Sequence, residues 1–307
     1  MALRFTLRQM EYLVAVGQCG SIALAAERLN VSSPTISTAI AQLEADFGLA
    51  LFLRKHAQGM ATTAAGAILI AECDAVLRAA GRLSELAHDL TGRIAGDLNL
   101  GCLLTFAQIL VPQLRRSFTE RYPQVHITQV ELHHAALIDG LRNAKLDLAL
   151  TYDLALPADL EFTAIATLPP FALFGAAHPL ARHSTVAVAD LAAFPMVLLD
   201  LPLSSDYFLS FFNKAGLTPL IAERTRDIAV MQSLVANDFG YSIANIRPMP
   251  DHAPDGRPLH LVPLAGPVQP MRLGLLSAAG SSARQTLRAF SAHVQDHLPG
   301  IVSPMQP

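Results

Sequence analysis

The stretch Ser21–Phe47, SIALAAERLNVSSPTISTAIAQLEADF, predicts two helices joined by a short turn. The first helix ends near Leu29. The second begins near Pro34, which suits the first turn because its missing N–H needs no partner there. Ser32 or Ser33 is placed to cap the second helix. Apolar residues of this helix recur at spacings of four, three and four and form one stripe: Ile36, Ile40, Leu43 and Phe47.

The face opposite this stripe is polar and carries no acid before Glu44. Its side chains are uncharged: Thr35, Ser37, Thr38 and Gln42. Such a face suits a helix that lies in the major groove of DNA, so the stretch predicts a helix-turn-helix. On this stretch alone, an ordinary helical hairpin with a polar outer face stays an alternative, because helix-turn-helix patterns are degenerate.

The composition indicates a well-packed globular chain without a strongly basic surface. The chain has 307 residues, 52% hydrophobic content and a net charge of −3, and this length suits two or three domains. Residues 1–63 carry five cations and four acids, a net charge of +1. Any affinity for DNA must therefore come from a few placed cations, from helix N-termini and from more than one copy of the domain.

Cysteine usage and missing motifs exclude several classes of protein. Cys19, Cys73 and Cys102 form no CxxC or Cys/His pattern, so we expect reduced thiols, no metal and no cofactor. The N-terminus lacks the apolar run of a signal peptide, and no stretch of about 20 residues is apolar enough for a membrane span, so we expect a cytoplasmic protein. No GxGxxG, GxSxG or HExxH motif supports an enzyme. A solute-binding receptor is an alternative, but it would leave the first 90 residues without a role.

The residues around the helix-turn-helix complete a compact unit. Thr6 is placed to cap a first helix that runs to about Cys19. The segment 49–66 predicts a hairpin with an apolar strand at Leu51–Leu53, a Gln58–Gly59 turn and a basic tip: Arg54, Lys55 and His56. This hairpin is typical of the wing of a winged helix-turn-helix, whose cations reach phosphates or the minor groove, and a solvated loop is the plain alternative.

The stretch Ala64–Leu90 predicts one long helix with a seven-residue repeat. Two sets of residues alternate along it at spacings of four and three: Leu69, Val76, Leu83 and Leu90 in one set, and Cys73, Ala80 and Ala87 in the other. This pattern is typical of a two-stranded coiled coil, so we expect the helix to form a homodimer. The alternative is one amphipathic helix that packs on its own domain.

Beyond a hinge at 91–96, strands and helices alternate in two similar series. A duplicated βαβαβ plan predicts two α/β lobes with a cleft between them. We place lobe I at about 94–165 and 271–297, and lobe II at about 166–270. Because ligands of open α/β sheets bind at the carboxyl ends of strands, the cleft is the predicted ligand site.

Several segments together resemble the LysR-type transcriptional regulators over nearly the full length of the chain. They are LRQMEYLVAVGQCGSIALAAERLNVSSPTISTAIAQLEADFGLALFLR, TTAAG, LVPQLRRSFTERYPQV, GLRNAKLDLAL and AAHPLA. The resemblance implies an α+β multidomain protein with a winged helix-turn-helix at 1–63, a dimerising linker helix at 64–93 and a two-lobed, periplasmic-binding-protein-like effector domain at 94–307. Such regulators are typically homotetramers that bind promoter DNA and respond to a small metabolite, and RNA polymerase is a further partner that this function allows.

The predicted DNA-contacting residues combine this resemblance with the polar face of the helix. They are Ser32, Ser33, Pro34, Thr35, Ser37, Thr38 and Gln42 in the recognition helix, with Arg54 and Lys55 in the wing. The chain departs from the family at Thr38, where arginine is common, so a base-reading cation is absent there. Thr38 instead offers a contact to a thymine methyl group or a phosphate.

The resemblance also predicts the segments that hold the effector. They supply Leu103, Leu104, Thr105, His133, His134, Tyr152, Leu201, Pro202, Ser204 and Ser205. Ser204 and Ser205 precede a helix, where hydroxyl and N–H groups suit a carboxylate, and a plain N-cap is the alternative. The adjacent His133 and His134 lack the spacing of a helical metal pair, so we expect a surface or capping role, with a role in the cleft as the alternative for His134. With leucines on the walls, the predicted effector is a small, partly apolar metabolite with a carboxylate or carbonyl group.

Overall fold

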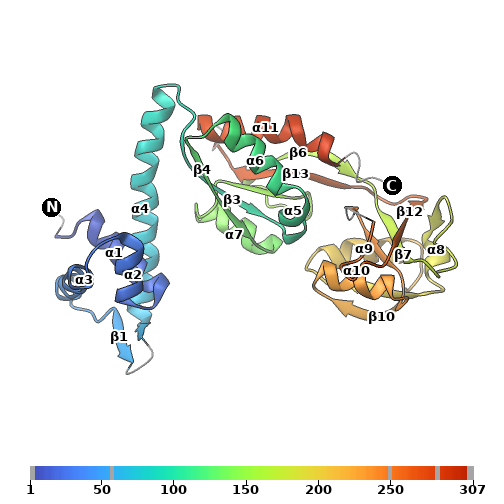
Figure 1. Ribbon diagram of the computed structural model, residues 1–307, viewed down its shortest axis with the longest axis horizontal. Coiled ribbons are helices and arrows are strands. Elements are labelled where there is room, and N and C mark those ends of the chain that lie inside the picture. The colour runs from blue at the N-terminus through green and yellow to red at the C-terminus, as the bar shows by residue number, and fades with distance from the viewer. Residues whose placement is uncertain (1–3, 56–58, 248–250, 281–283, 303–307) are drawn as a thin grey trace. The chain divides into compact units, whose positions relative to one another are not determined.

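The computed structural model describes residues 4–55, 59–247, 251–280 and 284–302. It divides into two compact units, Met1–Ala87 and His88–Pro307, and each unit has its own hydrophobic core (Figure 1). Among the helices in the described ranges, none is long and apolar enough to cross a membrane.

The first unit packs three helices and a hairpin around one core. Its elements are α1 Leu7–Cys19, α2 Ile22–Leu29, α3 Ser33–Phe47, β1 Phe52–Lys55 and β2 Gly59–Thr62. In the predicted stripe of α3, Ile36, Ile40 and Leu43 are buried, and Phe47 packs against the same core. The predicted pair of helices joined by a short turn is therefore confirmed.

Polar side chains set the start of these helices. Thr6 caps α1, as expected, and its hydroxyl accepts the N–H of Gln9. Ser32 caps α3 by accepting the N–H of Thr35 at 3.3 Å, so Ser33 is the first helical residue. Each helix then ends on a residue in the left-handed conformation: Gly20, Asn30 and Gly48. Local capping chemistry thus places α3 and the turn before it.

The hairpin differs from the expectation at its tip. Arg54 lies opposite Met60, and Lys55 lies opposite Gly59, in the antiparallel ladder of β1 and β2. Both cations therefore belong to a strand, and Gly59 belongs to the opposing strand, because pairing continues past Leu53. His56 and Gln58, the remaining residues of the predicted tip and turn, lie outside the described residues.

The long helix α4, Ala64–Leu90, has the predicted bounds, but its apolar residues serve two surfaces. Cys73 is buried in the core of the first unit, so the expectation that it lies in a seam between two copies is wrong. Other residues of α4 pack partly buried against that core: Leu69, Ile70 and Leu77. Three apolar side chains at seven-residue spacing are instead exposed, by 43%, 70% and 82%: Val76, Leu83 and Leu90.

The second unit begins with lobe I, a five-stranded sheet covered by helices. The strands are β3 Gly96–Cys102, β4 Val125–Glu131, β5 Leu148–Tyr152, β6 Leu160–Leu168 and β13 Met271–Ala278. The helices are α5 Leu104–Ile109, α6 Val111–Arg121, α7 His134–Arg142 and α11 Gln285–Val302. The sheet order is β4-β3-β5-β13-β6, and β3 pairs in parallel with both β4 and β5. Helices α6 and α11 cover one face and α7 covers the other (Figure 1).

Lobe II repeats this plan with its own sheet. Its elements are β7 Phe171–Gly175, β8 Val186–Ala187, α8 Val188–Leu191, β9 Pro195–Leu199, α9 Ser204–Lys214, β10 Leu220–Thr225, α10 Ile228–Ala236, β11 Ser242–Ala244 and β12 Leu259–Ala265. One ladder has the order β11-β7-β12-β8, and β9 pairs in parallel with β10. A bridge between Met196 and Tyr241 joins the two ladders. The chain leaves both β9 and β10 at the same edge, where α9 and α10 begin.

Asp147, just before β5, anchors the start of α11 to the sheet of lobe I. Its carboxylate accepts the backbone N–H of Asn99 at 2.7 Å and pairs with Arg284, and both charged side chains are less than 20% exposed. We expect Asp147→Asn to lower the free energy of unfolding of the second unit by about 2–3 kcal/mol, because it replaces the charged acceptor of a poorly solvated guanidinium and of the Asn99 N–H by a neutral amide. Urea unfolding followed by circular dichroism measures this loss.

The matched control is Asp153→Asn, which breaks the pair of Asp153 with the well-exposed Arg272. That change should cost less than about 1 kcal/mol, since water solvates an exposed guanidinium. Equal losses for the two variants would contradict the anchoring role of Asp147.

Candidate functional site

One face of α3 offers uncharged polar groups to solvent. The exposed residues of the predicted contact set are Ser32, Ser33, Pro34, Thr35, Thr38 and Gln42, and Ser37 is half-buried. The hydroxyls of Ser32 and Thr35 lie 2.7 Å apart, so these two side chains are already hydrogen-bonded to each other at the start of α3. Gln42 accepts a hydrogen bond from Gln9 of α1 at 3.3 Å. Ser33, Pro34, Ser37 and Thr38 are therefore the residues of this face whose side chains make no such contact within the described part of the chain.

The first unit has few cations, and some of them already form ion pairs or hydrogen bonds within the unit. Arg8 pairs with Glu11 and also donates to the hydroxyl of Tyr12, and these hydrogen bonds raise its pKa. Arg28 donates to Gln18 at 2.7 Å. For Arg54 and Lys55 the structure gives backbone positions in β1, and the reach of their side chains stays a prediction. A surface of this kind binds DNA through shape and hydrogen bonds as much as through charge.

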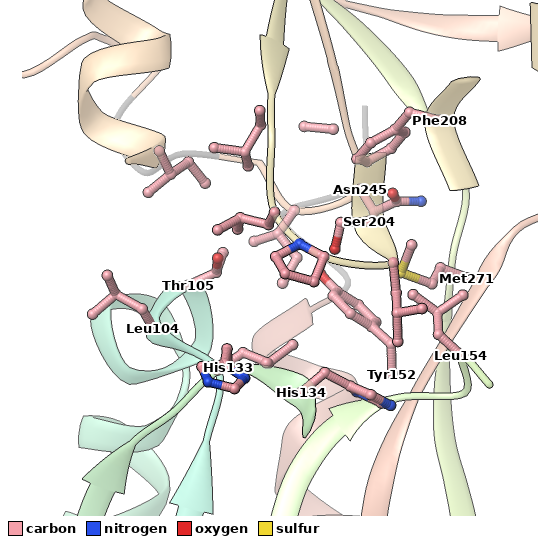
Figure 2. Close-up of a pocket in the computed structure, with 18 of the residues that line it drawn as sticks. Leu104, Thr105, His133, His134, Tyr152, Leu154, Ser204, Phe208, Asn245 and Met271 are labelled. Atoms are coloured by element: carbon pink, nitrogen blue, oxygen red, sulfur yellow. The ribbon is translucent and has the colours of Figure 1, made fainter. Parts of the chain in front are cut away.

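A pocket of about 300 Å³ opens among residues of both lobes in the second unit (Figure 2). Nine of the ten predicted effector residues line it: Leu103, Leu104, Thr105, His133, His134, Tyr152, Leu201, Pro202 and Ser204. The tenth, Ser205, does not, because its hydroxyl turns back and donates to the carbonyl of Leu201 at 3.0 Å. The structure thus gathers segments from the ends of β3, β4, β5 and β9 around one cavity.

The pocket also contains residues that the sequence analysis missed. Its lining includes Glu131, Leu132, Leu154, Leu199, Leu203, Phe208, Arg226, Ile228, Ile243, Ala244, Asn245, Ile246 and Met271. Most of them lie at or just beyond the carboxyl ends of strands, as Arg226 does after β10 and Asn245 does after β11. The carboxyl-end rule, applied also to the strands that became β10 and β11, is the signal that finds Arg226 and Asn245.

His134 lies at the start of α7 in the pocket wall and is 6% exposed. Its Nδ1 lies 3.0 Å from the hydroxyl of the fully buried Thr151. Burial lowers the pKa of the imidazole, and the backbone of Leu154 offsets part of that effect, so the ring is neutral near pH 7. His133 caps α7 instead, because its Nδ1 accepts the N–H of Ala136 at 3.3 Å. Across the described ranges, no three His, Cys, Asp or Glu side chains gather as a metal site.

Tyr152 and Asn245 bring polar groups into a largely apolar wall. The Tyr152 ring packs edge-on against Phe106, with centroids 4.8 Å apart, and burial raises the pKa of its phenol, so the hydroxyl keeps its proton. The amide of Asn245 donates to the carbonyl of Leu168 at 2.8 Å, which fixes which way the amide points. The pocket therefore suits a ligand with an apolar body and a small number of polar groups.

Comparisons with known proteins agree with this division into two units. The family model for the LysR substrate binding domain matches residues 91–299, and that for the bacterial regulatory helix-turn-helix protein of the lysR family matches residues 7–67. The chain is 28% identical over 298 residues to the transcriptional activator protein LysR of Escherichia coli (strain K12), and the match covers 97% of this chain and 94% of that protein.

Solved structures show the same likeness. The crystal structure of HinK, a LysR family transcriptional regulator from Pseudomonas aeruginosa, has a TM-score of 0.65 and 32% identity, and the match covers 96% of this chain and 99% of that one. Full-length CbnR complexed with its target DNA has a TM-score of 0.71 at 22% identity, with coverage of 95% and 99%. The second match is a likeness of fold alone.

Proposed function

Since the chain belongs to the LysR family of transcriptional regulators, with a helix-turn-helix DNA-binding domain and an effector-binding domain, we propose that α3 reads promoter DNA under the control of a small metabolite in the pocket. The observation that carries this proposal is the exposed, uncharged polar face of α3. The opposite face of this helix is buried in the core of the first unit. CbnR, a protein of similar fold, forms a complex with its target DNA, which supports the same use of this unit.

We further propose that the protein acts as a homodimer through the linker helix at 64–93 and assembles into a homotetramer. The exposed leucine and valine side chains of α4 support the dimer. Val76, Leu83 and Leu90 form an apolar stripe that the described residues of a single chain leave exposed to solvent. Two copies also supply the affinity that a net charge of +1 in residues 1–63 and an uncharged Thr38 do not. RNA polymerase as a partner and a cytoplasmic location complete this proposal.

The proposed effector is a small, partly apolar molecule with a carboxylate or carbonyl group. Leucine side chains supply much of the pocket wall, and Thr105, Tyr152 and Ser204 add hydroxyl groups. A cavity of about 300 Å³ is at the lower end of the range for small-molecule sites, so the ligand is metabolite-sized.

A metabolite screen of the full-length protein by thermal shift, followed by DNA-binding titrations with each hit, tests this function. A ligand that stabilises the second unit should also change the affinity for promoter DNA, because binding and regulation are linked. A protein that shows no steeply salt-dependent binding to any promoter fragment near its own gene would contradict the assignment of α3.

A further inference from the structure

The charged side chains of the pocket lining lie on opposite lobes. Among the described residues that line the cavity, Arg226 is the only arginine or lysine and Glu131 is the only acid. Arg226 follows β10 in lobe II, whereas Glu131 ends β4 in lobe I, and both side chains are exposed to solvent. Glu131 accepts a hydrogen bond from Gln129, while no described residue pairs with Arg226. The lobe II side of the pocket is therefore the positive side.

The N-terminus of α9 adds to this positive side. Three other helices begin at the pocket. His133 caps α7, and Asp227 caps α10 by accepting the N–H groups of Ala229 and Val230, whereas the six-residue α5 of lobe I has no side-chain cap. The first residue before α9 is Leu203, which caps nothing and has a φ of 66°. The partial positive charge at the start of this 11-residue helix therefore has no side-chain cap.

Arg226 and the start of α9 lie at one edge of lobe II. Strands β9 and β10 pair in parallel up to Leu199 and Thr225, and the N–H of Asp200 then bonds to the carbonyl of Thr225 at 2.7 Å. The segments that follow, which carry Leu203 and Arg226, thus leave adjacent strands at their carboxyl ends. Asp206, in the first turn of α9, is exposed and does not line the pocket.

Tyr152 gives an independent sign of a ligand at this place. The residue is only 9% exposed, yet its hydroxyl makes no hydrogen bond with any residue that the structure describes. Figure 2 shows the ring projecting from the lobe I side into the pocket, in the direction of Ser204 at the start of α9. The hydroxyl is therefore a hydrogen-bond donor at the pocket surface with no partner among the described residues, and a ligand oxygen at this position would accept its hydrogen bond.

We propose that Arg226, the start of α9 and the Tyr152 hydroxyl form an anion subsite, and that the effector is a monocarboxylic acid held there by its carboxylate. This inference rests on the proposed function of the pocket. Glu131 repels the carboxylate from the opposite lobe, so the apolar body lies against the leucines of lobe I, among them Leu103 and Leu154. Arg226 is then the residue that distinguishes an acid from its neutral amide, because the amide forms no charge-assisted hydrogen bond with a guanidinium.

Paired acids and amides with the same apolar body test the subsite by calorimetry on the full-length protein. The probes are benzoate with benzamide, cinnamate with cinnamamide, and hexanoate with hexanamide. In the best pair, the acid should bind at least about tenfold more tightly than the amide. Arg226→Gln should weaken binding of the acid by about ten- to a hundredfold and leave binding of the amide unchanged. Tyr152→Phe should weaken binding of the acid several-fold.

The matched control is Arg224→Gln, because Arg224 is an exposed arginine of β10 that pairs with Asp200 and does not line the pocket. This variant should bind the acids as the wild type does. Amides that bind as tightly as acids, acids that bind equally well to the Arg226→Gln protein, or no binding by any acid at millimolar concentration would each overturn the inference.

Failure of the inference is distinguishable from failure of the proposed function. Neutral compounds that change DNA affinity while the acids do not bind would overturn the anion subsite and leave the regulator intact. Acids that bind through Arg226 without changing DNA affinity would support the subsite and contradict control of α3 by the pocket.

Discussion

Thr38→Asp is expected to lower the affinity of the full-length protein for promoter DNA by about a hundredfold or more. Thr38 is exposed on α3, beside the uncharged residues that face solvent from its first turns. A carboxylate at this position would meet phosphates and base edges of like sign, and a dimer would carry it twice. Fluorescence anisotropy at one fixed ionic strength measures the change, because such affinities depend steeply on salt.

Thr185→Asp is the matched control, since it makes the same substitution at an exposed residue of the second unit. It should leave DNA affinity unchanged within about twofold at equal ionic strength. Both variants should keep the wild-type unfolding temperature, because neither side chain belongs to a core. Equal DNA affinities for Thr38→Asp and the control would show that α3 is not the reading helix.

Leu83→Asp is expected to weaken the dimer by about a hundredfold or more and to lower DNA affinity in parallel. Leu83 is 70% exposed in one chain, so a polar side chain costs the isolated chain little. In the proposed seam, the same change buries two unpaired carboxylates near the symmetry axis of the dimer. Analytical ultracentrifugation across a range of concentrations measures the dissociation constant.

Ala71→Asp is the control on the same helix. Ala71 is exposed and lies twelve residues before Leu83, which places its side chain about 120° away around α4. This variant should dimerise and bind DNA as the wild type does. A Leu83→Asp protein that sediments as the intact oligomer would refute the seam, whatever its affinity for DNA.

The first unit was predictable because its signals are local. Thr6, Ser32 and Pro34 mark helix starts by the chemistry of their own side chains and backbone, and the spacing of Ile36, Ile40 and Leu43 identifies the buried face of α3. The two possible caps of α3 differ by one residue, and the hydrogen bond of Ser32 to Thr35 decides between them. No local signal set the end of β1, since the pairing of Arg54 and Lys55 depends on residues across the hairpin.

The seven-residue pattern of α4 illustrates what sequence periodicity leaves open. A stripe at this spacing describes equally a helix that packs on its own domain and a helix that packs on a second copy. In the structure the stripe is divided, with Cys73 in the core of the first unit and Leu83 exposed. Tertiary packing decides which residues of α4 pack on their own domain and which stay exposed for a second copy. The seven-residue spacing is the same in both cases.

The pocket was predictable only in part, for a related reason. Nine of the ten predicted effector residues line the pocket, and Ser205 does not, because its hydroxyl bonds to the carbonyl of Leu201. Arg226 and Asn245 enter the pocket because β10 and β11 end at the same edge as β9. That adjacency is a property of strand order, and strand order follows from long-range pairing that a single sequence does not display.

The most direct test of the regulator is a nuclease footprint of the full-length protein on the DNA that flanks its own gene. If two copies of α3 occupy successive major grooves, the footprint will contain paired half-sites whose centres lie a whole number of helical turns apart, about 10–10.5 base pairs each. The Thr38→Asp protein will leave the same DNA unprotected. Protection without paired half-sites, or a footprint that persists in the Thr38→Asp protein, would contradict the central claim that paired copies of α3 read the promoter.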